Sequence, residues 1–298
     1  ATDVPTGEGF GKSLKFDCTT ADASLASDNQ LVIKHRIEGQ DIQQLKWGTS
    51  NAEKVTLCFW IKSTKTGTFI IELSRESRKI SQAYTVSSSD TWEKKTLTFD
   101  GDTGGSVVTN DSANRLEINI YMGVGTNYSS GTLDTAWTGG TNANRAVGQV
   151  NAFDSTSNNI LFTGIQLEIG SQATNFEHRS FGEELALCQR YFYQDVKGVT
   201  QEISVGWYYT SSAISWIVNF PVPMRASPTM AYSGPTDGFT IYRDGAADNF
   251  TALTIENVNY QYTRASCFNN NQVSGTAGQA GIVRATNAAC LVSFSADL

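Results

Sequence analysis

Long apolar runs and clusters of basic residues are both missing from this chain of 298 residues. No segment approaches the ~18 continuous apolar residues of a membrane-spanning helix, so membrane insertion is not expected. The formal net charge is −7, and Lys and Arg are scattered along the chain. A protein that binds a phosphate backbone normally carries a basic patch, so nucleic acid is not an expected partner.

Motifs for metal binding and nucleophilic catalysis are missing as well. The five cysteines are widely spaced without a C-x-x-C pair, and neither His35 nor His178 has a cysteine near it at zinc-ligand spacing. The sequence contains no G-x-S-x-G, Walker or H-E-x-x-H motif. We therefore expect free, buried thiols that pack as small hydrophobic groups, in a chain synthesised in a reducing cytoplasm.

The composition and the alternation of apolar residues favour β-structure. Charged residues are 17% of the chain, against about 25% in typical soluble domains, and glycine is frequent with 26 residues. Runs such as SLKFDC (13–18) and VTLCFWIKS (55–63) alternate apolar and polar residues, which is the period of half-buried strands. Because no helical crossovers separate these runs, we expect an all-β protein built of antiparallel sandwiches.

The stretch 163–192 holds four glutamates, His178 and two arginines, which raises the question of an active site. Ser180 and Glu183 have the S-x-x-E spacing of a capping box, which predicts a short amphipathic helix beginning there. We expect His178 and Arg179 to hold the preceding loop. Paired carboxylates in glycoside hydrolases face each other across a cleft, and capping glutamates give no reason to expect that. We therefore predict a structural linker, with no catalytic residue.

The same stretch carries a family resemblance. QLEIGSQATNFEHRSFGEELALCQRYF (166–192) is similar to a segment of tail-fibre and other virion-surface proteins of bacteriophages, whose usual form is close to QLE-G--AT-FEHRS-GEEL-LCQRYY. The similarity extends to SLKFDCTTADASLASDNQ (13–30) and FPVPMRASPTM (220–230). It covers residues 11–100 and 150–192 well, and the C-terminal part only at its edges.

The resemblance implies a jelly-roll first domain like a carbohydrate-binding module. We expect this domain over residues 1–176, a linker with a short helix over 177–194, and a smaller C-terminal β-sandwich over 195–298. It also implies a homotrimer on the virion surface that contacts other virion proteins. We expect a non-enzymatic tail-fibre or receptor-binding component that recognises a host cell-surface glycan. The alternatives are a capsid-decorating or fibre-assembly protein and a glycan-cleaving tailspike.

The long Gly- and Asn-rich loop over 123–154 is the expected glycan site. Sugar sites combine an aromatic platform with amide and carboxylate acceptors, and a loop of this length is usually functional or disordered. The alternative is that its tryptophan only plugs the edge of the sandwich. The candidate residues are Trp137, Tyr128, Asn127, Asp134 and Arg145.

Two further expectations concern aromatic residues and calcium. The run 206–216 has four large aromatics, for which contact between subunits is expected ahead of ligand contact: Trp207, Tyr208, Tyr209 and Trp216. Alternation places Tyr208 on the face opposite Trp207 and Tyr209. No cofactor is expected. Calcium is left open because clustered aspartates bind it, and the aspartates available are Asp100, Asp102, Asp111 and Asp154.

Overall fold

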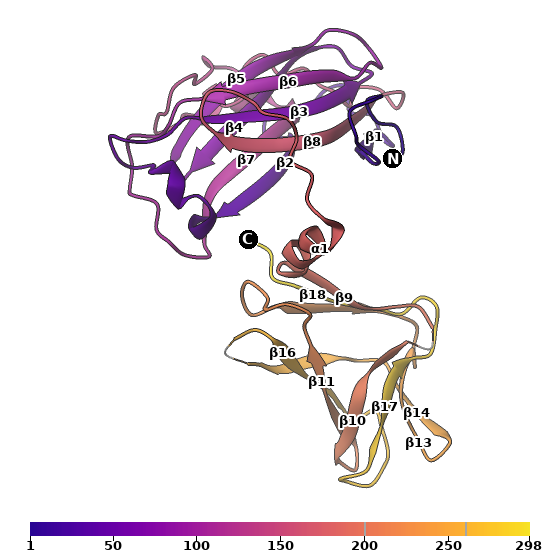
Figure 1. The fold of residues 1–298 in the computed structure, drawn as a ribbon. Coiled ribbons are helices and arrows are strands. Elements are labelled where there is room, and N and C mark those ends of the chain that lie inside the picture. The colour runs from indigo at the N-terminus through magenta and orange to yellow at the C-terminus, as the bar shows by residue number, and fades with distance from the viewer. Residues whose placement is uncertain (200, 260) are drawn as a thin grey trace. The chain divides into compact units, whose positions relative to one another are not determined.

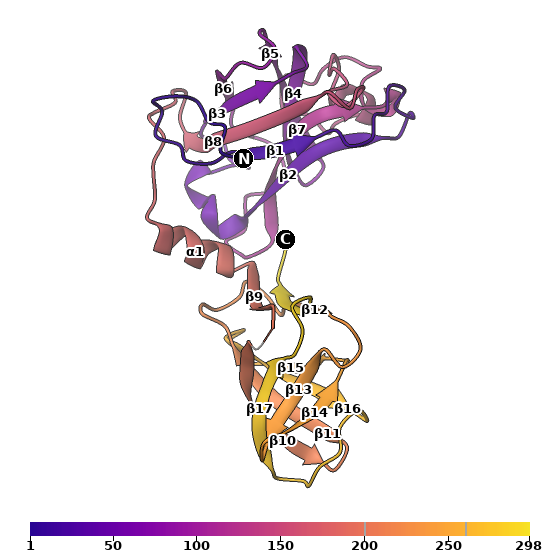
Figure 2. The ribbon, with the colours of Figure 1, turned by 90° about the vertical axis from the view of Figure 1, so that its right-hand side faces the viewer.

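The computed structural model describes residues 1–199, 201–259 and 261–298. The chain divides into one unit of residues 1–177 with Leu298 and a second unit of residues 178–297. Within the described residues, regular structure is antiparallel strand apart from one α-helix and four short 3-10 helices (Figures 1 and 2). The expected all-β fold with a short linking helix is confirmed.

The first unit is an eight-stranded jelly roll. Its two four-stranded sheets have the strand orders β1-β8-β3-β6 and β2-β7-β4-β5. Consecutive strands lie in opposite sheets, except β4 and β5, and this is the double Greek-key arrangement of the jelly roll. The strands of the first sheet are β1 (Leu14–Asp17), β8 (Asn159–Ile169), β3 (Val55–Ser63) and β6 (Glu93–Phe99). Those of the second are β2 (Gln30–Glu38), β7 (Asn114–Val124), β4 (Gly67–Arg75) and β5 (Arg78–Val86).

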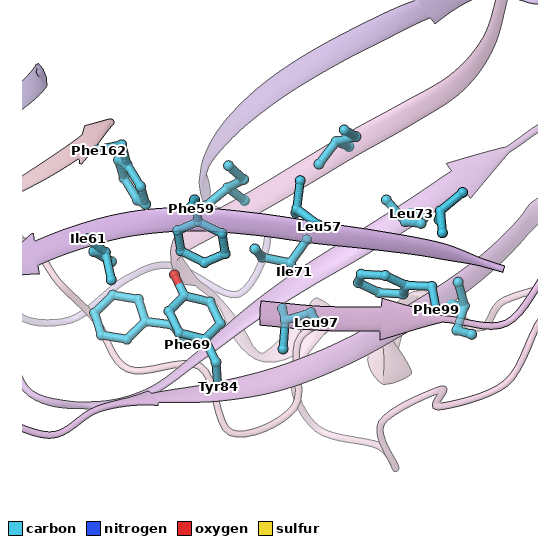
Figure 3. Packing of buried hydrophobic residues seen from close by; sticks show 14 of the residues in the cluster. Leu57, Phe59, Ile61, Phe69, Ile71, Leu73, Tyr84, Leu97, Phe99 and Phe162 are labelled. Carbon is cyan, nitrogen blue, oxygen red and sulfur yellow. The ribbon is translucent and has the colours of Figure 1, made fainter. Parts of the chain in front are cut away.

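The core of the first unit lies between its two sheets, as Figure 3 shows. The alternation predicted for 55–63 is confirmed, since Leu57, Phe59 and Ile61 are fully buried while Trp60 lies on the other face and is half-buried. The ring of Phe59 meets that of Tyr84 edge-on, with 5.2 Å between centroids. Each large side chain buried in this way contributes about 1.5–3 kcal/mol of transfer free energy, so the sandwich needs no other cross-link.

The second unit is a β-sandwich of unequal sheets. Its seven-stranded sheet has the order β14-β13-β17-β10-β11-β16-β15, and its three-stranded sheet the order β12-β18-β9. The strands of the larger sheet are β10 (Glu202–Thr210), β11 (Ala213–Asn219), β13 (Phe239–Arg243), β14 (Ala246–Phe250), β15 (Thr254–Val258), β16 (Arg264–Asn270) and β17 (Ala280–Ala285). Those of the smaller are β9 (Phe192–Lys197), β12 (Thr229–Ser233) and β18 (Leu291–Ser295).

The predicted helix is α1 (Phe181–Gln189), which belongs to the second unit. The helix ends at Gln189, and the chain then enters β9 at Phe192. No residue of α1 is buried, and Phe181 is 82% exposed. Among the described residues, no helical segment has the length and hydrophobicity of a membrane span.

Candidate functional site

Residues 174–177, which lead into the linker, are fixed to the jelly roll by two side chains of β8. The carboxylate of Glu168 accepts hydrogen bonds from Thr174 N at 3.0 Å and Thr174 Oγ1 at 2.5 Å. The amide of Gln166 accepts from Glu177 N at 2.7 Å and donates to Asn175 O at 3.3 Å. Burial alone would raise the pKa of Glu168, but the hydrogen bonds from Thr174 lower it below its ordinary value. Glu168 therefore anchors the backbone as a carboxylate.

Glu183, Glu184 and Arg179 make contacts at the start of the helix. Glu183 N donates to Ser180 Oγ at 3.3 Å, and the Glu183 carboxylate accepts from Ser180 N at 3.1 Å, which completes the predicted capping box. Arg179 Nη1 lies 2.8 Å from Glu184 Oε1 in an exposed ion pair. His178 is exposed, and its role in holding the loop stays a prediction.

A groove of about 550 Å³ runs beside α1 within the second unit. Its walls come from the helix and from the FPVPM segment, so the two parts of the second unit that carry the family resemblance meet there. The lining residues are Arg179, Glu183, Ala186, Leu187, Arg190, Val222 and Pro223. The one carboxylate in this wall, Glu183, is occupied by the capping box.

The long loop of the first unit is clamped onto the outer face of the β2-β7-β4-β5 sheet by a buried ion pair. Arg145 donates to Glu72 from Nε at 2.9 Å and from Nη2 at 2.7 Å. Glu72 is fully buried on β4, and Asn119 of β7 donates to the same carboxylate at 3.1 Å. Burial would lower the pKa of Arg145, but Glu72 raises it above its ordinary value, so the guanidinium stays charged.

Three other candidates of the loop lie around this pair. The Arg145 guanidinium carbon is 5.9 Å from the centre of the Tyr128 ring, and Tyr128 O accepts from Ala146 N. Asn127 is exposed and precedes Tyr128 in the chain. Asp134 Oδ1 accepts a hydrogen bond from Asn144 Nδ2 at 3.0 Å, so this oxygen already has a partner within the loop. The partly exposed Tyr128 and the exposed Asn127 thus form a platform beside the guanidinium of Arg145.

Trp137 lies elsewhere, at the edge of the sandwich. Its ring meets that of Trp47 edge-on at 5.2 Å, and its Nε1 donates to Asp100 O at 2.6 Å. It packs against the main core of the first unit, while Trp47 is fully buried. Trp137 is therefore separate from the candidates around Arg145, so the expected residues do not form a single site. Its contacts are those of a packing residue at the edge of the sandwich, which was the alternative.

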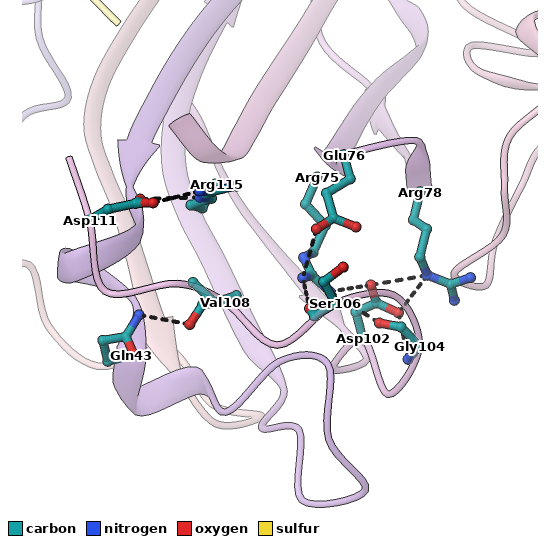
Figure 4. Close-up of polar contacts among 10 residues, drawn as sticks. All are labelled: Gln43, Arg75, Glu76, Arg78, Asp102, Gly104, Ser106, Val108, Asp111 and Arg115. Atoms are coloured by element: carbon teal, nitrogen blue, oxygen red, sulfur yellow. Dashed lines mark hydrogen bonds and ion pairs between the residues drawn. The ribbon is translucent and has the colours of Figure 1, made fainter. Parts of the chain in front are cut away.

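The four aspartates considered for calcium are each held by a basic side chain. Arg75 and Arg78 donate to the buried carboxylate of Asp102 at 2.8 and 2.9 Å, and Asp111 pairs with Arg115 (Figure 4). Asp100 pairs with Lys54, and Asp154 with Lys65. Among the described residues, no three His, Cys, Asp or Glu side chains gather in a metal-binding group.

The four aromatics of the second unit separate onto two faces. Tyr208 and Trp216 are fully buried in the core between the two sheets, so their expected place in a subunit interface is corrected. The physical reason is the alternation along β10 and β11, which directs both inward. Trp207 and Tyr209 point outward and are 36% and 66% exposed.

Sequence reasoning missed the two buried carboxylates, Glu72 and Asp102. The signal for Glu72 was its place within the apolar strand TFIIEL (68–73), where a charge must be paired or neutralised. Asp102 gave no such signal, because it lies in a polar loop and its partner arginines come from β4 and β5.

Comparisons with known proteins identify no family for the chain. No protein-family model matches it, and no curated protein does. A chain in a solved structure of Red Clover Necrotic Mosaic Virus aligns with 11% identity over 96% of this chain and 97% of its own length. The TM-score of that alignment is 0.15, which is too low to bear on fold or function.

Proposed function

We propose that this chain is a non-enzymatic virion-surface protein of a bacteriophage, a tail-fibre or receptor-binding component that recognises a host cell-surface glycan as a homotrimer. It would be made in the host cytoplasm and contact other virion proteins. The observation that carries the non-enzymatic part is the structural use of three of the four glutamates in residues 163–192. Glu168 holds backbone, Glu183 caps α1 and Glu184 pairs with Arg179.

The platform around Tyr128 supports the glycan-binding part of the proposal. A half-exposed aromatic ring can lie against the apolar C–H face of a sugar, while the exposed Asn127 amide can bond its hydroxyls and the guanidinium of Arg145 backs the ring. The buried pair with Glu72 fixes Arg145 before any ligand arrives. Because the loop is already ordered at this point, binding a ligand costs little conformational entropy there.

A glycan array with the full chain and three variants tests this proposal. Tyr128→Ala and Asn127→Ala are expected to reduce binding at least ~10-fold, because each removes a contact worth about 1.4 kcal/mol or more. Tyr232→Ala is the matched control, since it removes an exposed tyrosine of the other unit. Thermal unfolding checks that all variants fold. Full binding by Tyr128→Ala, or no binding by the unmodified chain to any bacterial surface polysaccharide, would reject the platform.

Cleavage is tested on the same samples. The proposal predicts that bound polysaccharide keeps its length, because the carboxylates of Glu168, Glu183 and Glu184 are engaged in structural contacts. Release of reducing ends by the unmodified chain would favour the tailspike alternative.

A further inference from the structure

The seven-stranded sheet of the second unit has an apolar outer face. The outward residues of its middle strand β10 are Val205, Trp207 and Tyr209, which are 64%, 36% and 66% exposed. The inward residue Tyr208 between them is fully buried. Antiparallel sheets with one solvated face normally alternate apolar and polar residues, whereas strands covered on both faces are apolar throughout. The pattern of β10 is that of a strand covered on both sides.

Two other strands of the sheet continue this surface: β17, which is paired with β10, and β16, which lies beyond β11. Ile282 of β17 lies directly opposite Val205 and is 36% exposed. The Phe268 ring of β16 lies 6.2 Å from that of Tyr209. We call these five residues the β10 face: Val205, Trp207, Tyr209, Phe268 and Ile282. Contiguous apolar surface of this kind marks an interaction site, whereas scattered apolar residues do not.

The charges at one end of the β10 face suit a copy of the same surface. Glu202 and Arg284 are directly opposite each other in the β10–β17 register, so both side chains lie on the outer face. The Arg284 guanidinium is stacked over the Tyr242 ring at 4.2 Å. A face that carries one acidic and one basic group lets the acidic group of one copy meet the basic group of the next copy around a symmetry axis.

The size of the sheet also suits a stable contact between copies. Seven strands spaced about 4.8 Å apart make a face roughly 29 Å wide, and a nine-residue strand such as β10 is about 30 Å long. Such a face is large enough to bury the ~800 Å² per partner of a standard interface. A sugar is a less suitable occupant of the centre of this face, because the side chains of Val205 and Ile282 offer no acceptors for its hydroxyls.

We infer that the β10 face is the surface through which copies of this chain associate, with Trp207 and Tyr209 as its central contacts. The inference deepens the homotrimer part of the proposed function and is independent of the glycan platform, which lies in the other unit. Large aromatic side chains at the centre of an interface commonly supply most of its affinity.

Sedimentation velocity of the full chain tests the inference. The unmodified chain should be oligomeric at micromolar concentration. The double variant Trp207→Thr, Tyr209→Thr keeps β-propensity and should raise the dissociation constant of self-association by roughly 100-fold or more. Val205→Lys, which brings like charges together across the contact, should also give monomers. Tyr232→Thr, at 40% exposure in the same unit, should assemble normally.

A monomeric unmodified chain, or normal assembly by the double variant or by Val205→Lys, would overturn the inference. Binding of a soluble oligosaccharide, measured on the same samples, reports on the glycan platform separately. A double variant that loses assembly and keeps this binding supports both proposals. Loss of oligosaccharide binding by Tyr128→Ala with normal assembly would show that the two surfaces are separate.

Discussion

The guanidinium of Arg145 closes a bidentate pair on the buried carboxylate of Glu72, with N–O distances of 2.9 and 2.7 Å. The two residues are 73 positions apart in the sequence, so this one contact fixes a long loop against the sheet beneath it. The Glu72 side chain has no exposed surface and that of Arg145 is 13% exposed. The pair is therefore shielded from the solvent that weakens surface ion pairs.

Removing one partner of this pair should be costly. Arg145→Met is expected to destabilise the first unit by about 3–5 kcal/mol, because Glu72 would remain as an uncompensated buried charge. The double variant Glu72→Met, Arg145→Met should recover much of that loss, since apolar residues can replace a buried pair. Urea denaturation of the full chain measures both. A single variant as stable as the unmodified chain would show that the loop is not held in this way.

Asp195 gives the second unit a defined pH dependence. Burial raises its pKa above the ordinary value, with Tyr193 Oη donating to Oδ1 at 3.0 Å and Oδ2 buried without a partner among the described residues. The folded state then disfavours the ionised form. The loss of folding stability caused by the ionised carboxylate is complete above the raised pKa and declines as the pH falls. It is absent below the pKa of the unfolded state, about 3.9.

Asp195→Asn should therefore raise the midpoint of thermal unfolding at pH 7 and leave it unchanged near pH 3. Asn keeps the acceptor for Tyr193 and removes the charge. Val196→Ala is a useful reference, because removing a buried methyl pair from the adjacent position should lower the midpoint equally at both pH values. A midpoint for Asp195→Asn that is lower at pH 7 than at pH 3, relative to the unmodified chain, would contradict this reading.

The cysteines should differ sharply in reactivity. Cys18, Cys58, Cys267 and Cys290 are buried, whereas Cys188 on α1 is exposed, which corrects the expectation of five buried thiols. Burial raises the pKa of Cys267 to about 12. A thiol reagent at neutral pH should modify one cysteine quickly and the other four only after unfolding. Fast modification of a second cysteine in the folded chain, or a fast phase that persists in Cys188→Ser, would contradict the burial pattern.

Calcium should not stabilise the chain. Because the carboxylate of Asp102 is already held by two arginines, chelator and millimolar calcium should leave the unfolding midpoint unchanged. Asp102→Asn should destabilise the first unit by about 3–5 kcal/mol, since it leaves the buried Arg75 without its counter-charge. A midpoint that rises with calcium in the unmodified chain would show that a site exists beyond these pairs.

The sequence predicted features that depend on near neighbours in the chain. The alternation of Leu57 and Phe59, and the capping box of Ser180 and Glu183, follow from local periodicity and local hydrogen bonding, and the structure has both. Partners distant in sequence were not predictable. Nothing in the spacing of Glu72 and Arg145 shows that they meet. For Trp137 the sequence left two roles open, a glycan contact and a plug at the edge of the sandwich, and its contact with Trp47 favours the second.

Locating the chain in an intact phage particle is the most direct test of the central claim that it is a virion-surface receptor-binding component. A cryo-electron microscopy reconstruction of particles carrying a labelled copy should show the label on a tail fibre, with the jelly roll accessible to solvent. Label on the icosahedral capsid lattice, or particles without it, would contradict the claim.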